Sequence, residues 1–232
     1  MRDHFESRAY LQRNPLIAIR AGLVADLLRD LQRKSVLDLG CGDGSLSAAL
    51  RGNDITLVDF SEVMLEQARR NVPGARHVQA DVLAWQPDRL YDAVLAVGLL
   101  AHVESVDRLL QKIAAALQPG GRCILQVTDA GHPLGWFLVR YGRIRRSGGY
   151  RTNDLSRREL IERAAAYGLR PVAARRYGLL LPGTGRLPYR WHSLIERRFA
   201  SGWFARAAAQ VLVMFVKPSA GKDDQEGVRG SR

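Results

Sequence analysis

The chain has 232 residues, 47% hydrophobic and 25% charged, a composition typical of a globular protein with a sizeable core. No apolar run approaches the about 18 residues that a membrane span requires, and the first residues lack the apolar stretch of a signal peptide. The net charge of +12 is unevenly placed: residues 131–232 carry 20 Lys and Arg against 7 Asp and Glu, whereas residues 1–130 carry 15 against 16. The composition therefore argues against a disordered or membrane-embedded chain and indicates a basic C-terminal half.

Apolar residues at helical spacing predict that residues 3–33 are helical. Pro15 is expected to open the longer helix, because proline is favoured in a first turn. The segment before it, which contains Phe5 and Tyr10, would form a short separate helix. This N-terminal region, residues 1–33, either closes over a ligand as a lid or only packs on the sheet.

Residues 35–47 combine a short apolar run with closely spaced glycines. Residues 36–39 predict a buried parallel strand, residues 40–44 read Gly-Cys-Gly-Asp-Gly, and residues 46–50 are helix-like. Glycine lets the chain turn sharply and leaves no side chain between its amides and a ligand. A strand, a glycine turn and a helix predict a nucleotide-binding corner, the alternative being a glycine-rich turn without a ligand.

Aspartates follow the next two predicted strands. Residues 55–59 end in Asp59, whose carboxylate can accept hydrogen bonds from the two hydroxyls of a ribose. An aspartate at a strand end often caps the following helix instead, but Ser61 can serve as that cap and leave Asp59 for a ligand. Met64 either lies against a ligand or packs in the core. A third unit, residues 75–83, consists of a short alternating strand followed by Asp81 and a turn. Asp81 either binds a ligand or is an ordinary loop residue.

The remaining pattern continues the alternation of strands and helices. A buried strand begins at Tyr91 and leads into a loop, and a helix follows that ends before Pro119, Gly120 and Gly121. The later predicted elements are helix Val106–Leu117, strand Arg122–Thr128, helix Ser156–Tyr167, and strands Arg170–Leu180 and Ala209–Val216. Residues 219–232 are polar and glycine-rich, and are expected to be disordered.

These signals occur together, in order, over residues 35–128. The run Asp38-x-Gly40-x-Gly42-x-Gly44, with Asp59 and Asp81 after it, resembles the class I S-adenosylmethionine-dependent methyltransferases. The resemblance implies an α/β, Rossmann-like, seven-stranded and mostly parallel sheet with helices on both faces, in a single domain over residues 1–218. It also implies S-adenosylmethionine (SAM) as cofactor and S-adenosylhomocysteine (SAH) as product. The cofactor-binding residues that it implies are Asp38, Gly40, Cys41, Gly42, Gly44, Asp59, Phe60, Met64, Asp81, Val82 and Val97.

Two segments in the basic half, residues 129–153 and 182–208, are expected to form substrate-side insertions. Both combine arginines, which suit phosphate or carboxylate groups, with aromatic and aliphatic side chains. This mixture predicts an anionic or amphiphilic acceptor or contact with an anionic membrane surface, the alternative being a solvated basic face. The candidate substrate-binding residues are Trp136, Arg140, Arg143, Arg146, Tyr189, Arg190 and His192.

Methyl transfer from a sulfonium is an in-line displacement that mainly requires alignment of the reacting groups. A general base helps when the acceptor is a hydroxyl. His102 follows the fourth strand and is the first candidate base, although a histidine there could instead support the cofactor pocket or cap a helix. Tyr10, His132 and His192 are further candidates. No cluster has metal-ligand spacing, so we expect no metal.

The leading hypothesis is a methyltransferase acting on oxygen or nitrogen of a small molecule. An RNA or tRNA methyltransferase is a second class, disfavoured because the fourth strand ends in Val97-Gly98-Leu99-Leu100 and not in an Asn-Pro-Pro-Tyr motif. A SAM-binding partner subunit without catalysis is a third, and turnover would separate it from an enzyme. The two lone cysteines, Cys41 and Cys123, are typical of a reduced cytoplasmic protein, and the basic half could allow peripheral membrane contact.

Overall fold

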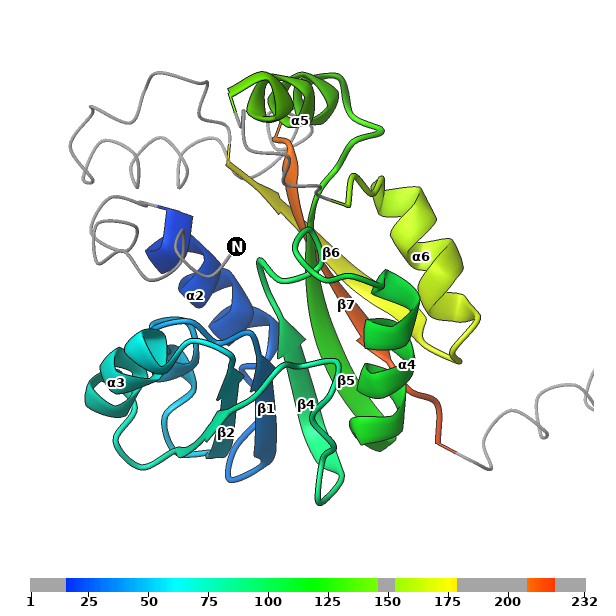
Figure 1. The fold of residues 1–232 in the computed structure, drawn as a ribbon. Helices are drawn as coiled ribbons and strands as arrows, with labels where there is room; N and C mark the ends of the chain where they lie inside the picture. Colours follow the sequence, from blue (N-terminus) through cyan, green and yellow to red (C-terminus); the bar gives the residue numbers. More distant parts are fainter. Residues whose placement is uncertain (1–15, 146–152, 179–207, 220–232) are drawn as a thin grey trace, which may run out of the picture.

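The computed structural model describes residues 16–145, 153–178 and 208–219, in which seven strands form one sheet with the order β3-β2-β1-β4-β5-β7-β6 (Figure 1). The strands are β1 (Ser35–Leu39), β2 (Asp54–Asp59), β3 (Arg76–Gln79), β4 (Tyr91–Ala96), β5 (Leu117–Thr128), β6 (Arg170–Tyr177) and β7 (Gln210–Val216). The helices are α2 (Leu16–Leu27), the 3-10 helix η2 (Ser47–Leu50), α3 (Glu62–Asn71), α4 (Val106–Ala116), α5 (Pro133–Arg145) and α6 (Arg157–Ala165).

The strands from β3 to β5 pair in parallel, whereas β7 is antiparallel to both of its neighbours, β5 and β6. The predicted seven-stranded, mostly parallel sheet is therefore confirmed. From β1 the chain builds outward through β2 to β3, and then returns to place β4 on the other side of β1. In open sheets of this kind, ligands bind in the crevice at the carboxyl ends of the strands where the order reverses. That point lies here between β1 and β4.

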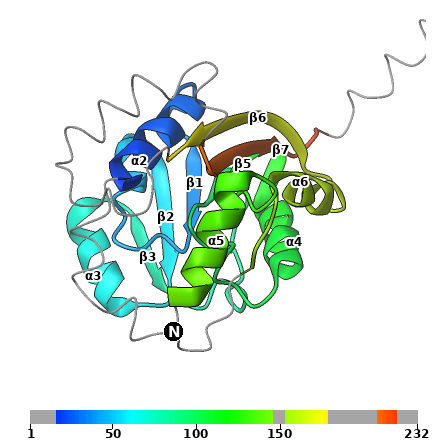
Figure 2. The same ribbon diagram turned by 90° about the horizontal axis from the view of Figure 1, so that it is seen from above.

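Alternating side chains of the strands divide the core into one layer on each face of the sheet. In β1, Val36 packs with the helices α2 and α3, whereas Leu37 and Leu39 pack with α4 and α6. Helices consequently cover both faces, as expected (Figure 1). Seen from above, α5, which belongs to the segment 129–153, lies across the carboxyl edge of the sheet (Figure 2). That this segment faces a substrate stays a prediction.

Several predicted boundaries were wrong. The helix-like stretch after the glycines is only the single 3-10 turn η2, because Arg51, Gly52 and Asn53 lead directly into β2. The strand expected from Arg122 begins five residues earlier, at Leu117, because the apparent helix-stop residues join the sheet: the Gly120 amide donates to the Lys217 carbonyl at 2.7 Å.

The other elements differ from prediction at their ends. Ser156 caps α6 instead of beginning it. Within the third unit, residues 75–83, β3 covers residues 76–79 and the chain turns at Asp81. Several predictions fall outside the described residues: Pro15 as a helix start, the short helix expected before it with Phe5 and Tyr10, almost all of the 182–208 insertion, and the tail beyond Ser219.

Candidate cofactor site

The glycine loop after β1 is built from backbone conformations that other residues rarely adopt. Gly40, Gly42 and Gly44 have φ angles of 68°, 55° and 72°. A Cβ at Gly40 would lie 2.9 Å from Leu99 Cδ1, and one at Gly44 would lie 3.2 Å from Ala68 Cβ. A Cβ at Gly42, by contrast, would meet no protein atom within 4 Å. The outer two glycines thus permit close packing, and the middle one leaves open space above the loop.

Asp59, at the carboxyl end of β2, is 6% exposed and holds the glycine loop in place. Its Oδ2 accepts a hydrogen bond from the Gly42 amide, and its Oδ1 accepts one from the Ser61 amide, both at 2.9 Å. Burial raises the pKa of Asp59, although these amide hydrogen bonds oppose the shift. Ser61 does cap α3 by accepting from the Met64 amide, as predicted. The Asp59 carboxylate also supports the loop, a role that the sequence analysis did not foresee, and its binding of a ligand stays a prediction.

Asp81 organises the turn after β3. One carboxylate oxygen accepts from the Leu83 amide at 2.8 Å, and the Asp81 carbonyl accepts from the Trp85 amide at the same distance. The carboxylate itself is exposed, whereas the neighbouring Val82 is buried. The turn therefore presents an acidic group beside an apolar one.

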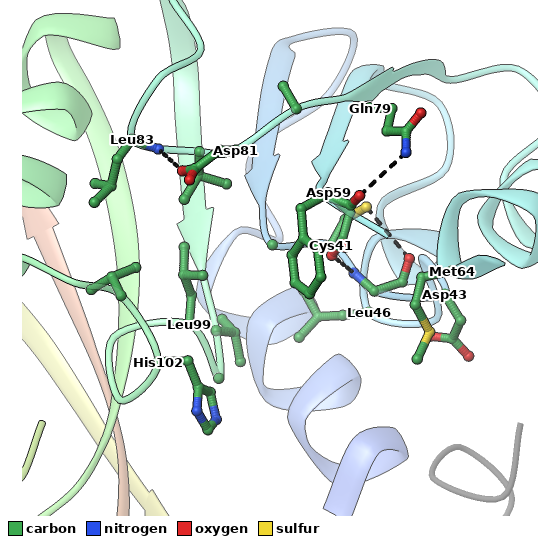
Figure 3. Close-up of a pocket in the computed structure, with 18 of the residues that line it drawn as sticks. Cys41, Asp43, Leu46, Asp59, Met64, Gln79, Asp81, Leu83, Leu99 and His102 are labelled. Atoms are coloured by element: carbon green, nitrogen blue, oxygen red, sulfur yellow. Dashed lines mark hydrogen bonds between the residues drawn. The ribbon is translucent and has the colours of Figure 1, made fainter. Parts of the chain in front are cut away.

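These elements enclose a cavity of about 720 Å³ at the switch between β1 and β4. Figure 3 shows the Asp59 and Asp81 side chains on either side of it, with His102 at its far edge. The lining comes from α2, the glycine loop, the end of β2, α3, the end of β3 with the turn after it, and the loop after β4. Its residues are Ile17, Arg20, Gly40, Cys41, Gly42, Asp43, Leu46, Asp59, Phe60, Met64, Gln79, Ala80, Asp81, Val82, Leu83, Val97, Gly98, Leu99, His102, Val103 and Glu104.

Most residues predicted to bind the cofactor line this cavity. Two do not: Gly44 packs against α3, and Asp38 lies beneath the loop. Asp38 is 3% exposed, and its Oδ2 accepts a hydrogen bond of 2.6 Å from the Ser47 hydroxyl. Burial raises the pKa of Asp38 to about 7, with a smaller contribution from the negative charge of Asp59. A role of Asp38 near a ligand ammonium stays a prediction.

The raised pKa of Asp38 predicts a pH-dependent stability. The buried carboxyl is protonated in the folded chain but ionised in the unfolded chain above its ordinary pKa near 4. The stabilisation therefore is complete below pH 4 and is lost as the pH rises towards 7. Between pH 5 and pH 8, the free energy of unfolding of the wild type should fall by about 2 to 3 kcal/mol relative to that of Asp38→Asn. Urea unfolding of both proteins at the two pH values measures this, and parallel profiles would contradict it.

Helix α2 contributes a residue that the sequence analysis did not single out. Among the described lining residues, Arg20 is the one arginine or lysine, and its Nε donates to the Tyr177 hydroxyl at 2.8 Å. The signal available in the sequence was a single arginine inside the apolar stretch Leu16–Leu27. From periodicity alone, this arginine would be assigned to the solvent face of the helix. Only the tertiary structure shows that α2 lies over the carboxyl ends of the strands.

The candidate bases are placed differently. His102 lines the cavity, and its backbone amide donates to the Leu99 carbonyl at 2.8 Å. His132 does not line it and precedes α5. Tyr10 and His192 lie outside the described residues. His102 is thus the candidate that the described part of the chain brings to the cavity.

The predicted substrate residues are only partly described. Trp136 is 57% exposed on α5, with the Arg140 guanidinium 5.8 Å from its ring centroid, and neither residue lines the cavity. Arg143 belongs to α5, but its side chain is not among those described. Arg146, Tyr189, Arg190 and His192 lie outside the described residues.

Two negative findings apply to the described ranges alone. Within them, no group of three or more His, Cys, Asp or Glu side chains could hold a metal ion. None of the helices there is long and apolar enough to cross a bilayer. Cys41 and Cys123 are both buried free thiols, and burial raises the pKa of each.

Comparison with known proteins agrees with this geometry. The family model of the methyltransferase domain matches residues 11–174. Trans-aconitate 2-methyltransferase of Paracidovorax citrulli is 39% identical over 100 residues, which are 40% of this chain and 38% of that protein. Ubiquinone biosynthesis O-methyltransferase of Idiomarina loihiensis is 32% identical over 138 residues, which are 51% and 57% of the two chains. Among solved structures, magnesium protoporphyrin IX methyltransferase of Synechocystis PCC 6803 with bound SAH superimposes with a TM-score of 0.64 at 19% identity, covering 93% of this chain and 97% of that one.

A sheet of this order, with a glycine loop at its switch point and acidic residues after β2 and β3, defines a class I SAM-dependent methyltransferase fold. The chain belongs to the methyltransferase domain family, as the match over most of its length shows. It spans less than two thirds of the length of the curated relatives quoted above.

Proposed function

We propose that the protein transfers a methyl group from SAM to an oxygen or nitrogen of a small-molecule acceptor. The observation that carries this proposal is the cavity of about 720 Å³, which combines the glycine loop, two acidic turns and Arg20 in one place. Each part suits a different portion of the cofactor, which consists of an adenine, a ribose and an amino acid.

The adenine end is assigned to the turn after β3. The exposed Asp81 carboxylate can accept from an exocyclic amino group, and the buried Val82 offers an apolar contact beside it. Asp59 is assigned to the ribose hydroxyls. Two amide hydrogen bonds fix the orientation of this carboxylate. Because a carboxylate can accept about four hydrogen bonds, capacity remains for the ribose hydroxyls.

The amino-acid end is assigned to the glycine loop and Arg20. Above Gly42 the space is open, so that a ligand can approach the backbone. The carboxylate of the methionine moiety favours a cationic partner. Among the described lining residues, Arg20 carries the one guanidinium group, and no lysine is present. When bound, SAM supplies an electrophilic methyl group on a sulfonium. The protein residues hold the cofactor and acceptor in line and exclude water.

His102 is proposed as the group that removes a proton from the acceptor. It lines the cavity just beyond the end of β4, where the acceptor is expected. His102→Asn should lower kcat about 100-fold or more, the usual contribution of a general base, and leave the Kd for SAH within about twofold. His132→Gln, outside the cavity lining, is the matched control. An unchanged kcat in His102→Asn would remove the histidine from this role.

The acceptor is proposed to be anionic or amphiphilic. The charge of residues 131–232 supports this, as does the exposed pair of Trp136 and Arg140 on α5, which presents an aromatic ring together with a cation. Relatives named for trans-aconitate and for ubiquinone biosynthesis support a small molecule as acceptor. The same surface is proposed to allow peripheral contact of a cytoplasmic protein with anionic membranes.

The test is SAM-dependent release of SAH with separate pools of carboxylic acids, phenols, amines, phospholipid extract and total tRNA. Turnover with one of the small-molecule or lipid pools would support the proposal and select the acceptor class. Turnover with tRNA alone would establish the RNA methyltransferase alternative. Tight SAH binding without turnover in any pool would favour a non-catalytic partner subunit.

A further inference from the structure

Arg20 contacts a residue that is distant from it in sequence. Its Nε donates to the Tyr177 hydroxyl at 2.8 Å, and its guanidinium carbon lies 5.7 Å from the centroid of the same ring. The two residues are 157 positions apart in sequence. Tyr177 is the last residue of β6, the edge strand at the opposite side of the sheet from β3. The end of β6 lies beside α2, as Figure 2 shows.

The surroundings leave the outer part of the guanidinium directed to the cavity. Tyr177 is fully buried, in the same core layer as Val24 and Leu27 of α2, so its ring is a rigid support. Nε is occupied by the hydroxyl, and Nη1 lies 3.8 Å from the position where a Cβ would stand at Gly98, a cavity-lining residue. No described carboxylate forms an ion pair with Arg20, although most other arginines with described partners have one.

We propose that Tyr177 is a positioning residue that orients Arg20 towards the carboxylate of the bound cofactor. This inference rests on the proposed function, because it requires the cavity to take SAM. An unrestrained arginine loses substantial rotamer freedom when it binds an anion, whereas an arginine already fixed by a hydrogen bond and a ring loses less. Tyr177 thus acts on the ligand through Arg20 and without touching it. Cofactor affinity is thereby linked to the docking of α2 against β6.

The experiment compares two ligands that differ at the amino-acid end. SAH carries the carboxylate, and 5′-methylthioadenosine keeps the adenine, ribose and sulfur but lacks the amino acid. Isothermal titration with Tyr177→Phe should show a Kd for SAH raised about fivefold to tenfold, the scale of one net hydrogen bond, and an unchanged Kd for 5′-methylthioadenosine. Arg20→Gln should raise the Kd for SAH further. Adding Tyr177→Phe to Arg20→Gln should then cause no additional loss of affinity for SAH.

Tyr91 provides a matched control. It is also a fully buried tyrosine with an arginine over its ring, Arg89 at 5.0 Å, and its hydroxyl is hydrogen-bonded to Thr56. It begins β4 and so lies at the end of that strand away from the cavity. Tyr91→Phe should cost a similar amount of stability and leave both dissociation constants unchanged.

The outcomes separate the inference from the function on which it rests. Equal loss for both ligands in Tyr177→Phe would indicate a merely structural residue and overturn the inference, as would no loss for SAH. If Tyr177→Phe does not fold, Arg20→Lys tests the same geometry, because a lysine retains the charge but has no Nε to donate to the hydroxyl. Arg20→Lys should raise the Kd for SAH at least as much as is expected for Tyr177→Phe. A Kd equal to that of the wild type would overturn the inference. If the wild type does not bind SAH at all, the proposed function itself fails.

Discussion

Gly42→Val is expected to abolish measurable binding of SAH, with a loss of at least about 100-fold, or about 2.7 kcal/mol. The glycine has a φ of 55°, and the space above it is open because no protein atom would meet a Cβ there. A valine side chain would therefore occupy the volume assigned to the ligand. It would also strain the loop, since a β-branched residue is strongly disfavoured in the left-handed region. Isothermal titration with SAH measures the effect.

The control for Gly42→Val is Gly52→Val. Gly52 has a φ of 93°, is exposed, and likewise has no atom within 4 Å of an added Cβ, but it lies in the turn before β2, outside the cavity lining. Its substitution carries the same kind of backbone strain without blocking the proposed site. Equal affinity of Gly42→Val and Gly52→Val for SAH would show that the open space above Gly42 does not hold the cofactor.

Asp59→Ala is expected to weaken SAH binding by about 1 to 3 kcal/mol, the range for hydrogen bonds to a charged group. Two causes contribute. The proposed acceptor for the ribose hydroxyls is lost, and the Gly42 amide loses the carboxylate oxygen that holds it at 2.9 Å. Asp59→Asn, which keeps one carbonyl oxygen, should lie between the alanine variant and the wild type. Titration with SAH again provides the measurement.

Asp54→Ala is the matched control, because Asp54 begins the strand that Asp59 ends. Its carboxylate forms an exposed ion pair with Arg89 at the edge of the sheet away from the cavity. Surface pairs of this kind contribute little to stability. SAH affinity should therefore be unchanged in this variant. A loss confined to turnover in Asp59→Ala, with intact SAH affinity, would remove Asp59 from the ribose site.

Local patterns in the chain were sufficient for the parallel half of the sheet. The strands β1, β2 and β4 are short apolar runs buried on both faces, and each is followed by glycine, aspartate or a turn. Glycines at alternate positions and acids at strand ends constrain the backbone and the chemistry locally. Together with the family resemblance, they were enough to predict nine of the lining residues between Gly40 and Val97, but not Asp43, Leu46, Gln79, Ala80 or Leu83. The predicted start of β5 was wrong, because Pro119 and Gly120 indicate a helix stop. There, pairing with Lys217, distant in sequence, brings those residues into the sheet.

Taken by itself, the sequence determined the order of strands and helices, the glycine loop, and the acids Asp59 and Asp81 near the ends of β2 and β3. Each of these features depends on neighbours within a few residues. The tertiary structure alone decided three things: that Asp38 lies beneath the loop against Ser47, that Asp59 supports the loop, and that Arg20 reaches the cavity. These depend on contacts between distant segments, above all the one between Arg20 and Tyr177. Periodicity reports which face of a helix is buried, but only packing against a particular strand decides which polar side chain of that helix meets the site.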